Sequence, residues 1–231
     1  MNEKRDTAGP FTGIGAGDRP EAVQRDTKTR ILDAAERLFA GSGFHNTSLR
    51  AITNDAGVNI AAVNYHFGSK ESLIEEVFKR RLLPINRIRR EELEKIRDAA
   101  GRENRRPDAR DVMHAFIAPV FRFRDTEPGA AAFISLVGRT MGEPDQRLRE
   151  KLMDHFRPMF FLCYEILCEA LPDVSREVLF WRLQFSIGAM SHTLHMLDQL
   201  KVFPEGVVPA FDAATMTDMV VSFVTAGVEV S

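Results

Sequence analysis

Three glycine-containing turns divide the first third of this chain of 231 residues. The stretches GSGF at 41–44, AGV at 56–58 and FGSK at 67–70 each contain glycine, which readily takes the left-handed backbone conformation that ends helices. Eleven residues separate the first two turns and eight separate the second pair, which leaves room for about two to three helical turns in each interval. We therefore expect a helix, two short helices and a longer helix in succession.

Beyond residue 25 the apolar residues recur with a helical period, and no strand pattern competes with it. Thr47 is expected to cap the first short helix, and a long helix is predicted from Lys70 to about Ala99. Further helices are predicted at about 107–125, 129–140, 144–171, 175–201 and 209–229. The predicted fold class is all-α, with an N-terminal three-helix unit joined by a long helix to a C-terminal helical domain.

Composition and pattern divide the chain into three parts. Residues 1–25, rich in Gly, Pro and charge, are expected to form a flexible arm, followed by the three-helix unit at 26–73 and the larger domain at 74–231. We expect a cytoplasmic protein without a membrane partner, because neither a secretory signal nor a membrane-length apolar run is found. Cys163 and Cys168 fit reduced thiols better than a disulfide framework.

The second half of the predicted long helix is strongly basic. Its cations are Arg80, Arg81, Arg87, Arg89, Arg90, Lys95 and Arg97. Glu91, Glu92 and Glu94 lie within one helical turn of several of them, so we expect a solvated, ion-paired face rather than a binding patch.

Two short helices joined by a tight turn at Gly57, and braced by the helix before them, indicate a helix-turn-helix. On a helical wheel, the second short helix turns Ile60, Val63 and Phe67 inward. The residues predicted to face outward are Ala61, Ala62, Asn64 and Tyr65. A solvated helix would carry Lys and Glu there, so this face is better suited to pressing into a groove of DNA.

Each residue type on that face has a physical use against a duplex. Alanine allows close approach and can meet a thymine methyl group, and Asn64 can pair with adenine. Tyr65, His66 and Lys70 can reach phosphates around the helix end. Core packing is the alternative for Tyr65, and helix capping the alternative for His66. The net charge of −2 means that binding would depend on this local placement rather than on a global basic field.

Residues 29–78 resemble the DNA-binding domain of the tetracycline-repressor (TetR) family without a gap. The motifs TSLRAI, AGV and NYHFGSKESL stand at the family's spacing, while Asn64 replaces the usual aromatic residue and Gly68 a frequent Pro or Lys. The Asn64 difference bears on which bases are read. The resemblance implies double-stranded DNA contacts from Thr47, Ser48, Arg50, Asn59, Ala61, Ala62, Asn64, Tyr65, His66 and Lys70.

The C-terminal half resembles the PsrA-like subgroup of that family, regulators of fatty-acid metabolism, over 133–160 and 169–197. The resemblance implies a helical ligand-binding and dimerisation domain. Small residues in the helix at 175–201, and the wide apolar arc of the helix at 209–229, favour a homodimer built through these two helices.

The middle of the chain is unusually aromatic, and a subset of these residues is expected to line a cavity. The candidates are Phe116, Phe121, Phe133, Arg139, Met141, Phe160 and Trp181. We expect a small apolar effector, with a fatty acid or its coenzyme A thioester as first choice. Arg122, Arg139 and Arg182 are the candidates for holding its acid end.

The predicted function is a ligand-responsive transcriptional repressor that binds a pseudo-palindromic operator as a dimer. The alternatives are a DNA-binding regulator without a small-molecule effector, or one with an aromatic, drug-like effector. No catalytic residue and no cofactor are predicted, because nucleophile elbow, HExxH and convincing phosphate loop are all missing. His192, His195 and Asp198 have a metal-compatible spacing but lack a fourth ligand, so no metal is predicted.

Overall fold

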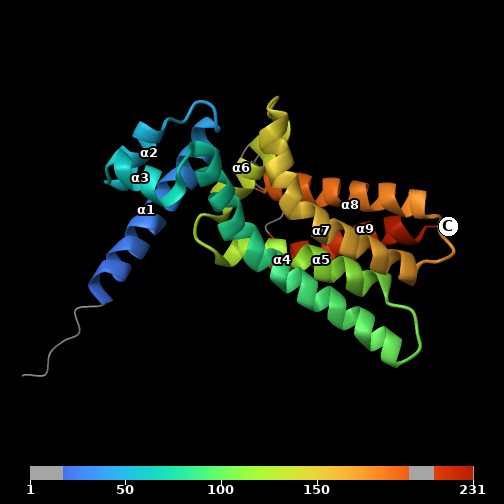
Figure 1. The fold of residues 1–231 in the computed structure, drawn as a ribbon. Helices are drawn as coiled ribbons and strands as arrows, with labels where there is room; N and C mark the ends of the chain where they lie inside the picture. The colour runs from blue at the N-terminus through green and yellow to red at the C-terminus, as the bar shows by residue number, and fades with distance from the viewer. Residues whose placement is uncertain (1–17, 198–210, 231) are drawn as a thin grey trace, which may run out of the picture.

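A computed structural model describes residues 18–197 and 211–230, with side chains from residue 26 onward, and these residues form helices and no strands (Figure 1). The helices are α1 (Asp18–Ser42), α2 (Leu49–Ala56), α3 (Ile60–Phe67), α4 (Lys70–Arg102), α5 (Ala109–Thr126), α6 (Ala130–Gly142), α7 (Gln146–Ala170), α8 (Arg176–Met196) and α9 (Ala213–Glu229). The all-α prediction is confirmed. In the two described ranges, no helix is long and apolar enough to cross a membrane.

The first helix is longer than expected. It begins at Asp18, so residues 18–25 of the predicted flexible arm are helical, and that part of the prediction is wrong. Pro20 stands in the first turn of α1, where a missing backbone N–H costs little, and the following residues extend a helix that is already nucleated. Residues 1–17, the rest of the expected arm, lie outside the described part.

The other predicted boundaries shift by a few residues. α4 continues past Ala99 to Arg102, and α9 begins at Ala213, where the side chain of Asp212 accepts from the backbone N–H of Thr215. The predicted helical residues at 198–201 and 209–210 lie outside the described residues.

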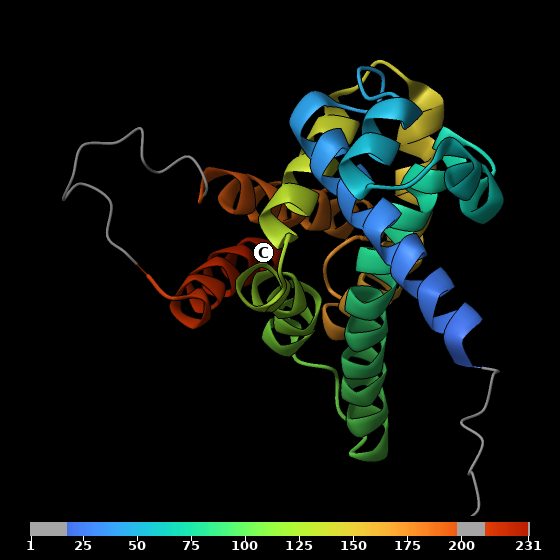
Figure 2. The same cartoon turned by 90° about the vertical axis from the view of Figure 1, so that its left-hand side faces the viewer.

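The buried apolar side chains form two clusters. In the first, Phe39, Ile52 and Val63 of the helix-turn-helix unit pack with residues of α4, and α6 and α7 contribute Phe133 and Leu148. The three-helix unit therefore shares its core with α4, α6 and α7 of the C-terminal domain. Figures 1 and 2 show this part at one end of the molecule, with α6 beside α1.

The second cluster fills the C-terminal domain. It joins the later part of α4 to α5, α7, α8 and α9, with Leu93, Phe116, Cys163, Leu183 and Val221 among its members. α5 packs along α9, and α4 packs along both α5 and α7. These contacts place α5 in the middle of the domain.

Candidate nucleic-acid interface and effector domain

The first short helix is capped by Ser48 rather than by Thr47. The Ser48 Oγ accepts a hydrogen bond from the backbone N–H of Ala51 at 3.0 Å, with extended backbone angles at the cap. Thr47 is buried, and its hydroxyl donates to the carbonyl of Gly43 at 2.8 Å. The capping prediction was therefore wrong by one residue. The hydroxyl of Thr47, one of the predicted DNA contacts, is thus engaged inside the fold.

The turn between α2 and α3 is fixed from both sides. Gly57 takes left-handed backbone angles, with φ 63°, and its N–H bonds back to the carbonyl of Asn54 at 3.2 Å. Arg30 of α1 donates to the carbonyls of Ala56 at 2.5 Å and Gly57 at 3.1 Å. The left-handed backbone angle favours glycine at position 57, and a Cβ there would stand 2.7 Å from the Arg30 Nη2, so Arg30 would have to move away from the turn.

The third helix presents the face that the sequence predicts, with one error. Val63 and Phe67 are buried, while Asn64 and Tyr65 are exposed, and the Tyr65 side chain is 74% exposed. Core packing of Tyr65, the alternative, is thus excluded. Ile60 was predicted to face inward, but it is 48% exposed, because it is the first residue of α3 and lies beyond the core that Val63 and Phe67 enter.

The remaining predicted DNA contacts divide by exposure. Ser48, Arg50, Asn59 and Ala61 are exposed, whereas Ala62 and His66 are half-buried. Asn59 caps α3 by accepting from the N–H of Ala62 at 2.9 Å. A depression of about 340 Å³ between α2 and α3 is lined by Arg50, Thr53, Asn54, Val58, Asn59 and Ile60.

Lys70 has an additional partner beside its predicted role. Its ammonium group lies 4.3 Å from the centre of the Phe44 ring, and partial burial lowers the pKa of Lys70. The side chain is half-buried at the start of α4, where Ser69 caps the helix. Its cation is therefore held in one place by an aromatic face.

The seven residues predicted to line an effector cavity do not lie together. Phe116 and Phe121 belong to the second cluster and Phe160 packs against it, but Phe133 belongs to the first cluster, with its ring 6.0 Å from that of Phe123. Three of the seven, Arg139, Met141 and Trp181, are exposed, and Trp181 is 59% exposed. A single cavity lined by all seven is therefore wrong.

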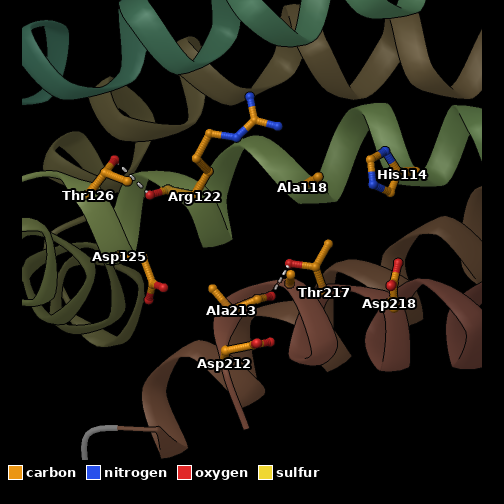
Figure 3. A pocket seen from close by; sticks show the side chains of 10 residues that line it. His114, Ala118, Arg122, Asp125, Thr126, Asp212, Ala213, Thr217 and Asp218 are labelled. Atoms are coloured by element: carbon orange, nitrogen blue, oxygen red, sulfur yellow. Dashed lines mark hydrogen bonds between the residues drawn. The ribbon is translucent and has the colours of Figure 1, made fainter.

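A groove of about 550 Å³ lies between α5 and α9 and contains none of those seven residues. Half of its lining residues are ionisable, and the full set is His114, Ala118, Arg122, Asp125, Thr126, Asp212, Ala213, Ala214, Thr217 and Asp218. Figure 3 shows Ala118 and Thr217 facing each other across it, while Arg122 points away from α9. Its polarity does not suit a long acyl chain.

The two helices predicted to form a dimer carry apolar side chains at the surface. Those exposed on α8 are Val178, Trp181 and Phe185, and those on α9 are Met219 and Phe223. The helices pack on each other, and the Arg182 Nη1 donates to the carbonyl of Val228 at 3.0 Å. Arg182, a candidate for an effector's acid end, is therefore engaged in joining α8 to α9.

Ionic contacts join the three-helix unit to the rest of the chain. Glu36 of α1 is 3% exposed and accepts from Arg80 at 2.5 Å and from the Nη2 of Arg81 at 2.7 Å. Arg81 also donates to the carbonyl of Pro128, in the segment between α5 and α6, at 2.8 Å. These two arginines were predicted to lie on a solvated face. That prediction is wrong for them, because α1 covers this part of α4.

Arg89 contradicts the same prediction more strongly. It is 3% exposed, and its Nε donates to the carbonyl of Phe116 at 2.7 Å. Its guanidinium carbon lies 4.3 Å from the centre of the Phe116 ring. The i,i+4 pairs predicted farther along are present, with Arg87 and Glu91 at 4.0 Å. Sequence spacing alone does not show that Arg89 points at α5.

In the residues with described side chains, no group of three or more His, Cys, Asp or Glu is arranged to hold a metal ion. His192 and His195 are exposed on α8, and Asp198, the third member of the weak metal pattern, lies outside the described part.

A short helix held by core residues, with an exposed outer face that follows a tight turn, defines a helix-turn-helix DNA-binding protein. The family model described as "Bacterial regulatory proteins, tetR family" matches residues 31–77, and that described as "Tetracyclin repressor-like, C-terminal domain" matches residues 114–227. The chain belongs to the TetR family of DNA-binding transcriptional regulators.

Curated relatives match only over the N-terminal unit. The HTH-type transcriptional regulator UidR of Escherichia coli (strain K12) is 37% identical over 60 residues, which is 26% of this chain and 31% of UidR. The HTH-type transcriptional repressor KstR2 of Rhodococcus jostii (strain RHA1) is 38% identical over 52 residues, which is 22% of this chain and 26% of KstR2. The match thus spans less than a third of the length of these relatives.

Solved structures match over most of the chain. The transcriptional regulator FadR from Bacillus subtilis, in complex with stearoyl-CoA, superposes with a TM-score of 0.64 at 16% identity, over 86% of this chain and 98% of that one. The fatty acid degradation regulator FadR from Bacillus halodurans gives a TM-score of 0.62 at 17% identity, over 89% and 97%. At such identities the likeness concerns the fold.

Proposed function

We propose that this protein is a ligand-responsive repressor that binds a pseudo-palindromic operator as a homodimer. The observation that carries the proposal is the outer face of α3, where Asn64 and Tyr65 are exposed while Val63 and Phe67 anchor the helix. A helix of eight residues covers few base pairs. A twofold pair of such helices, about 34–36 Å apart, would read two half-sites in successive major grooves.

The test of this surface compares base reading with phosphate contact. Asn64→Ala should cost about 1–3 kcal/mol on the preferred operator and relax the sequence preference. Arg50→Ala, which removes an exposed cation of α2, should weaken binding to all DNA sequences alike and reduce the salt dependence of binding. Lys95→Ala, exposed on α4, is the control. Competition binding that finds an unchanged base preference in Asn64→Ala would contradict the assignment of Asn64.

The exposed apolar side chains of α8 and α9 support a homodimer through these helices. Trp181 and Phe185 stand a turn apart on α8, and Phe223 is exposed on α9. Large apolar side chains grouped on neighbouring surface helices are typical of protein interfaces. A second copy of the chain, bringing the same two helices across a twofold axis, would cover them and set the spacing of the two reading helices.

For the effector we propose an acyl compound, a fatty acid or its thioester. Two observations support it: the likeness to a FadR bound to stearoyl-CoA, and an effector-domain core whose buried side chains include Met113, Met159 and Phe116. Thioether side chains repack readily around an inserted chain. Each buried CH₂ contributes about 0.8 kcal/mol, so affinity should rise with chain length until the space is filled.

The effector test is a titration of saturated fatty acids and their thioesters of increasing length against the protein–operator complex. Release should occur at lower concentration for longer chains, since the ligand must favour the arrangement that does not bind DNA. A flat response to all of them would refute the acyl effector. Release by a small charged compound instead would direct attention to the ionisable groove between α5 and α9.

A further inference from the structure

Arg89 is a buried cation without an anion. Within the described ranges, no carboxylate pairs with it, and its Nε–H to Phe116 is the hydrogen bond that its guanidinium makes. Burial lowers the pKa of Arg89 to about 10, so it remains protonated at neutral pH. Cys163 is the titratable group whose charge would affect it, but burial raises the pKa of Cys163 to about 12, which keeps the thiol neutral.

An unpaired charge inside a protein is costly unless something compensates it. The Phe116 carbonyl and ring supply one hydrogen bond and one cation–π contact, which leaves the two terminal nitrogens of Arg89 available to another acceptor. A neutral hydrogen-bond donor would be enough to join α4 to α5 at the Phe116 carbonyl, so this contact alone does not require a full positive charge.

A second buried polar atom lies one turn earlier on α4. The Asn86 Nδ2 donates to the carbonyl of His155 on α7 at 2.8 Å, but the Asn86 Oδ1 is buried with no hydrogen-bond partner. Residues three apart share a helix face, so Asn86 and Arg89 both face the junction of α4, α5 and α7. The Oδ1 would accept from a hydroxyl group beside an acid, or from a water bound with it.

We propose that Arg89 binds the carboxylate of the effector, with the acyl chain lying among the apolar residues of the second cluster. The proposal rests on the acyl effector proposed above and names its recognised end. Arg139 and Arg122 are exposed, and Arg182 donates to Val228, so Arg89 is the one buried arginine among the described residues.

The geometry favours a free carboxylate over the phosphates of a coenzyme A group. The guanidinium of Arg89 carries one positive charge, and its Nε already donates to Phe116. Its two terminal nitrogens can therefore donate to the two oxygens of one carboxylate and offset its single negative charge. The recorded neighbours of Arg89, Phe116 and Cys163, are both members of the second apolar cluster. Several phosphate charges would find no further buried arginine among the described residues.

The test is calorimetric titration with dodecanoate, 1-dodecanol and dodecanoyl-CoA, which share a chain and differ in the head group. The variant is Arg89→Met, which keeps an unbranched, flexible apolar stem and removes the guanidinium with its charge. The matched control is Arg90→Met, which removes an exposed neighbour paired with Glu94 at 3.8 Å. Wild type and control should bind dodecanoate about tenfold to a hundredfold more tightly than dodecanol, and Arg89→Met should bind the two alike.

Each other outcome overturns a different statement. If Arg89→Met keeps the preference for the acid, the carboxylate lies elsewhere, while the acyl effector stands. If only dodecanoyl-CoA binds, the free acid is wrong and the effector class stands. If none of the three binds the wild type, the acyl effector and the Arg89 site both fail.

A measurement on the wild type covers the case in which Arg89→Met does not fold. Dodecanoate labelled with ¹³C at the carboxyl carbon reports its own ionisation by NMR as pH is lowered. Beside a buried guanidinium, the pKa of the bound acid should lie below that of an exposed carboxyl group, about 4.3 for a glutamate side chain. A raised pKa would mean burial without a cation and would refute the site.

Discussion

The substitution Glu36→Gln tests the ionic connection between α1, α4 and the segment before α6. The carboxylate of Glu36 accepts from Arg80, and from both Nε and Nη2 of Arg81 at 2.9 and 2.7 Å. Glutamine has nearly the same shape, but it loses the charge and one acceptor oxygen. Arg81 would keep the carbonyl of Pro128, and the one remaining side-chain oxygen at position 36 would have to serve both arginines.

The expected cost is about 3 kcal/mol of unfolding free energy. Removing one partner of a buried ion pair costs about 3–5 kcal/mol, because the other charge is left uncompensated. The lower end applies here, since Arg80 and Arg81 are partly exposed and Arg80 still pairs with Asp33 at 2.6 Å. For a chain of this size, that loss corresponds to a fall in Tm of about 6–12 °C.

Thermal and urea unfolding of wild type, Glu36→Gln and Glu91→Gln should be compared at one protomer concentration, because dimerisation would link stability to concentration. Glu91→Gln breaks an exposed pair with Arg87 at 4.0 Å and should cost less than about 1 kcal/mol. If Glu36→Gln is no less stable than this control, the cluster does not hold the domains together.

Two further predictions concern acid stability and assembly. The Lys151 and Lys79 ammonium groups lower the pKa of Glu75 to about 2, from 4.5, so this contribution is present above pH 4.5 and is lost as pH falls toward 2. Lys151→Met should therefore lower the free energy of unfolding by about 1 kcal/mol at pH 7, a value discounted because the Glu75 side chain is 32% exposed. Urea unfolding at pH 3 should show less than half of that loss. Equal losses at the two pH values would contradict the prediction. Phe223→Glu should sediment as a helical monomer with weakened operator binding, unlike Lys95→Glu on exposed α4, and a persistent dimer would place the interface elsewhere.

Most helices could be predicted from the sequence, because their turn residues and apolar periodicity agree with the way the helices pack in the fold. Glycines end α2 and α3, and the buried residues Val63 and Phe67 follow the helical period. The helical wheel wrongly predicted that Ile60 is buried. Periodicity assumes that neighbouring helices cover the whole length of a helix, whereas the first turn of α3 extends past its neighbours. The start of α1 was missed because charge and Pro were read as disorder, although Pro20 stands in a first turn, where helices tolerate it.

The effector cavity predicted from the sequence was not found, because composition counts aromatic residues without showing which helices meet. Phe133 was grouped with Phe116, yet the two lie in different clusters. Arg89 was read as solvated because acids follow it along the chain, while its burial comes from α5, some twenty-seven residues away. Periodicity on α4 could have flagged Arg89, since it stands seven residues after Leu82 and four before Leu93, both buried.

The way the two clusters meet constrains how an effector can act on DNA binding. The three-helix unit shares its apolar core with Phe133 of α6 and is tied to Pro128 through Arg81. The next residue, Gly129, has a φ of 81°, a left-handed conformation that favours glycine. A ligand that parts α4 from α5 must move the α5–α6 connection or break these contacts. Because Glu36 lies on α1, which braces the turn at Gly57 through Arg30, either change would reach α3. If the proposed effector acts in this way, the free energy of the Glu36 cluster would set how much differential affinity that effector must supply.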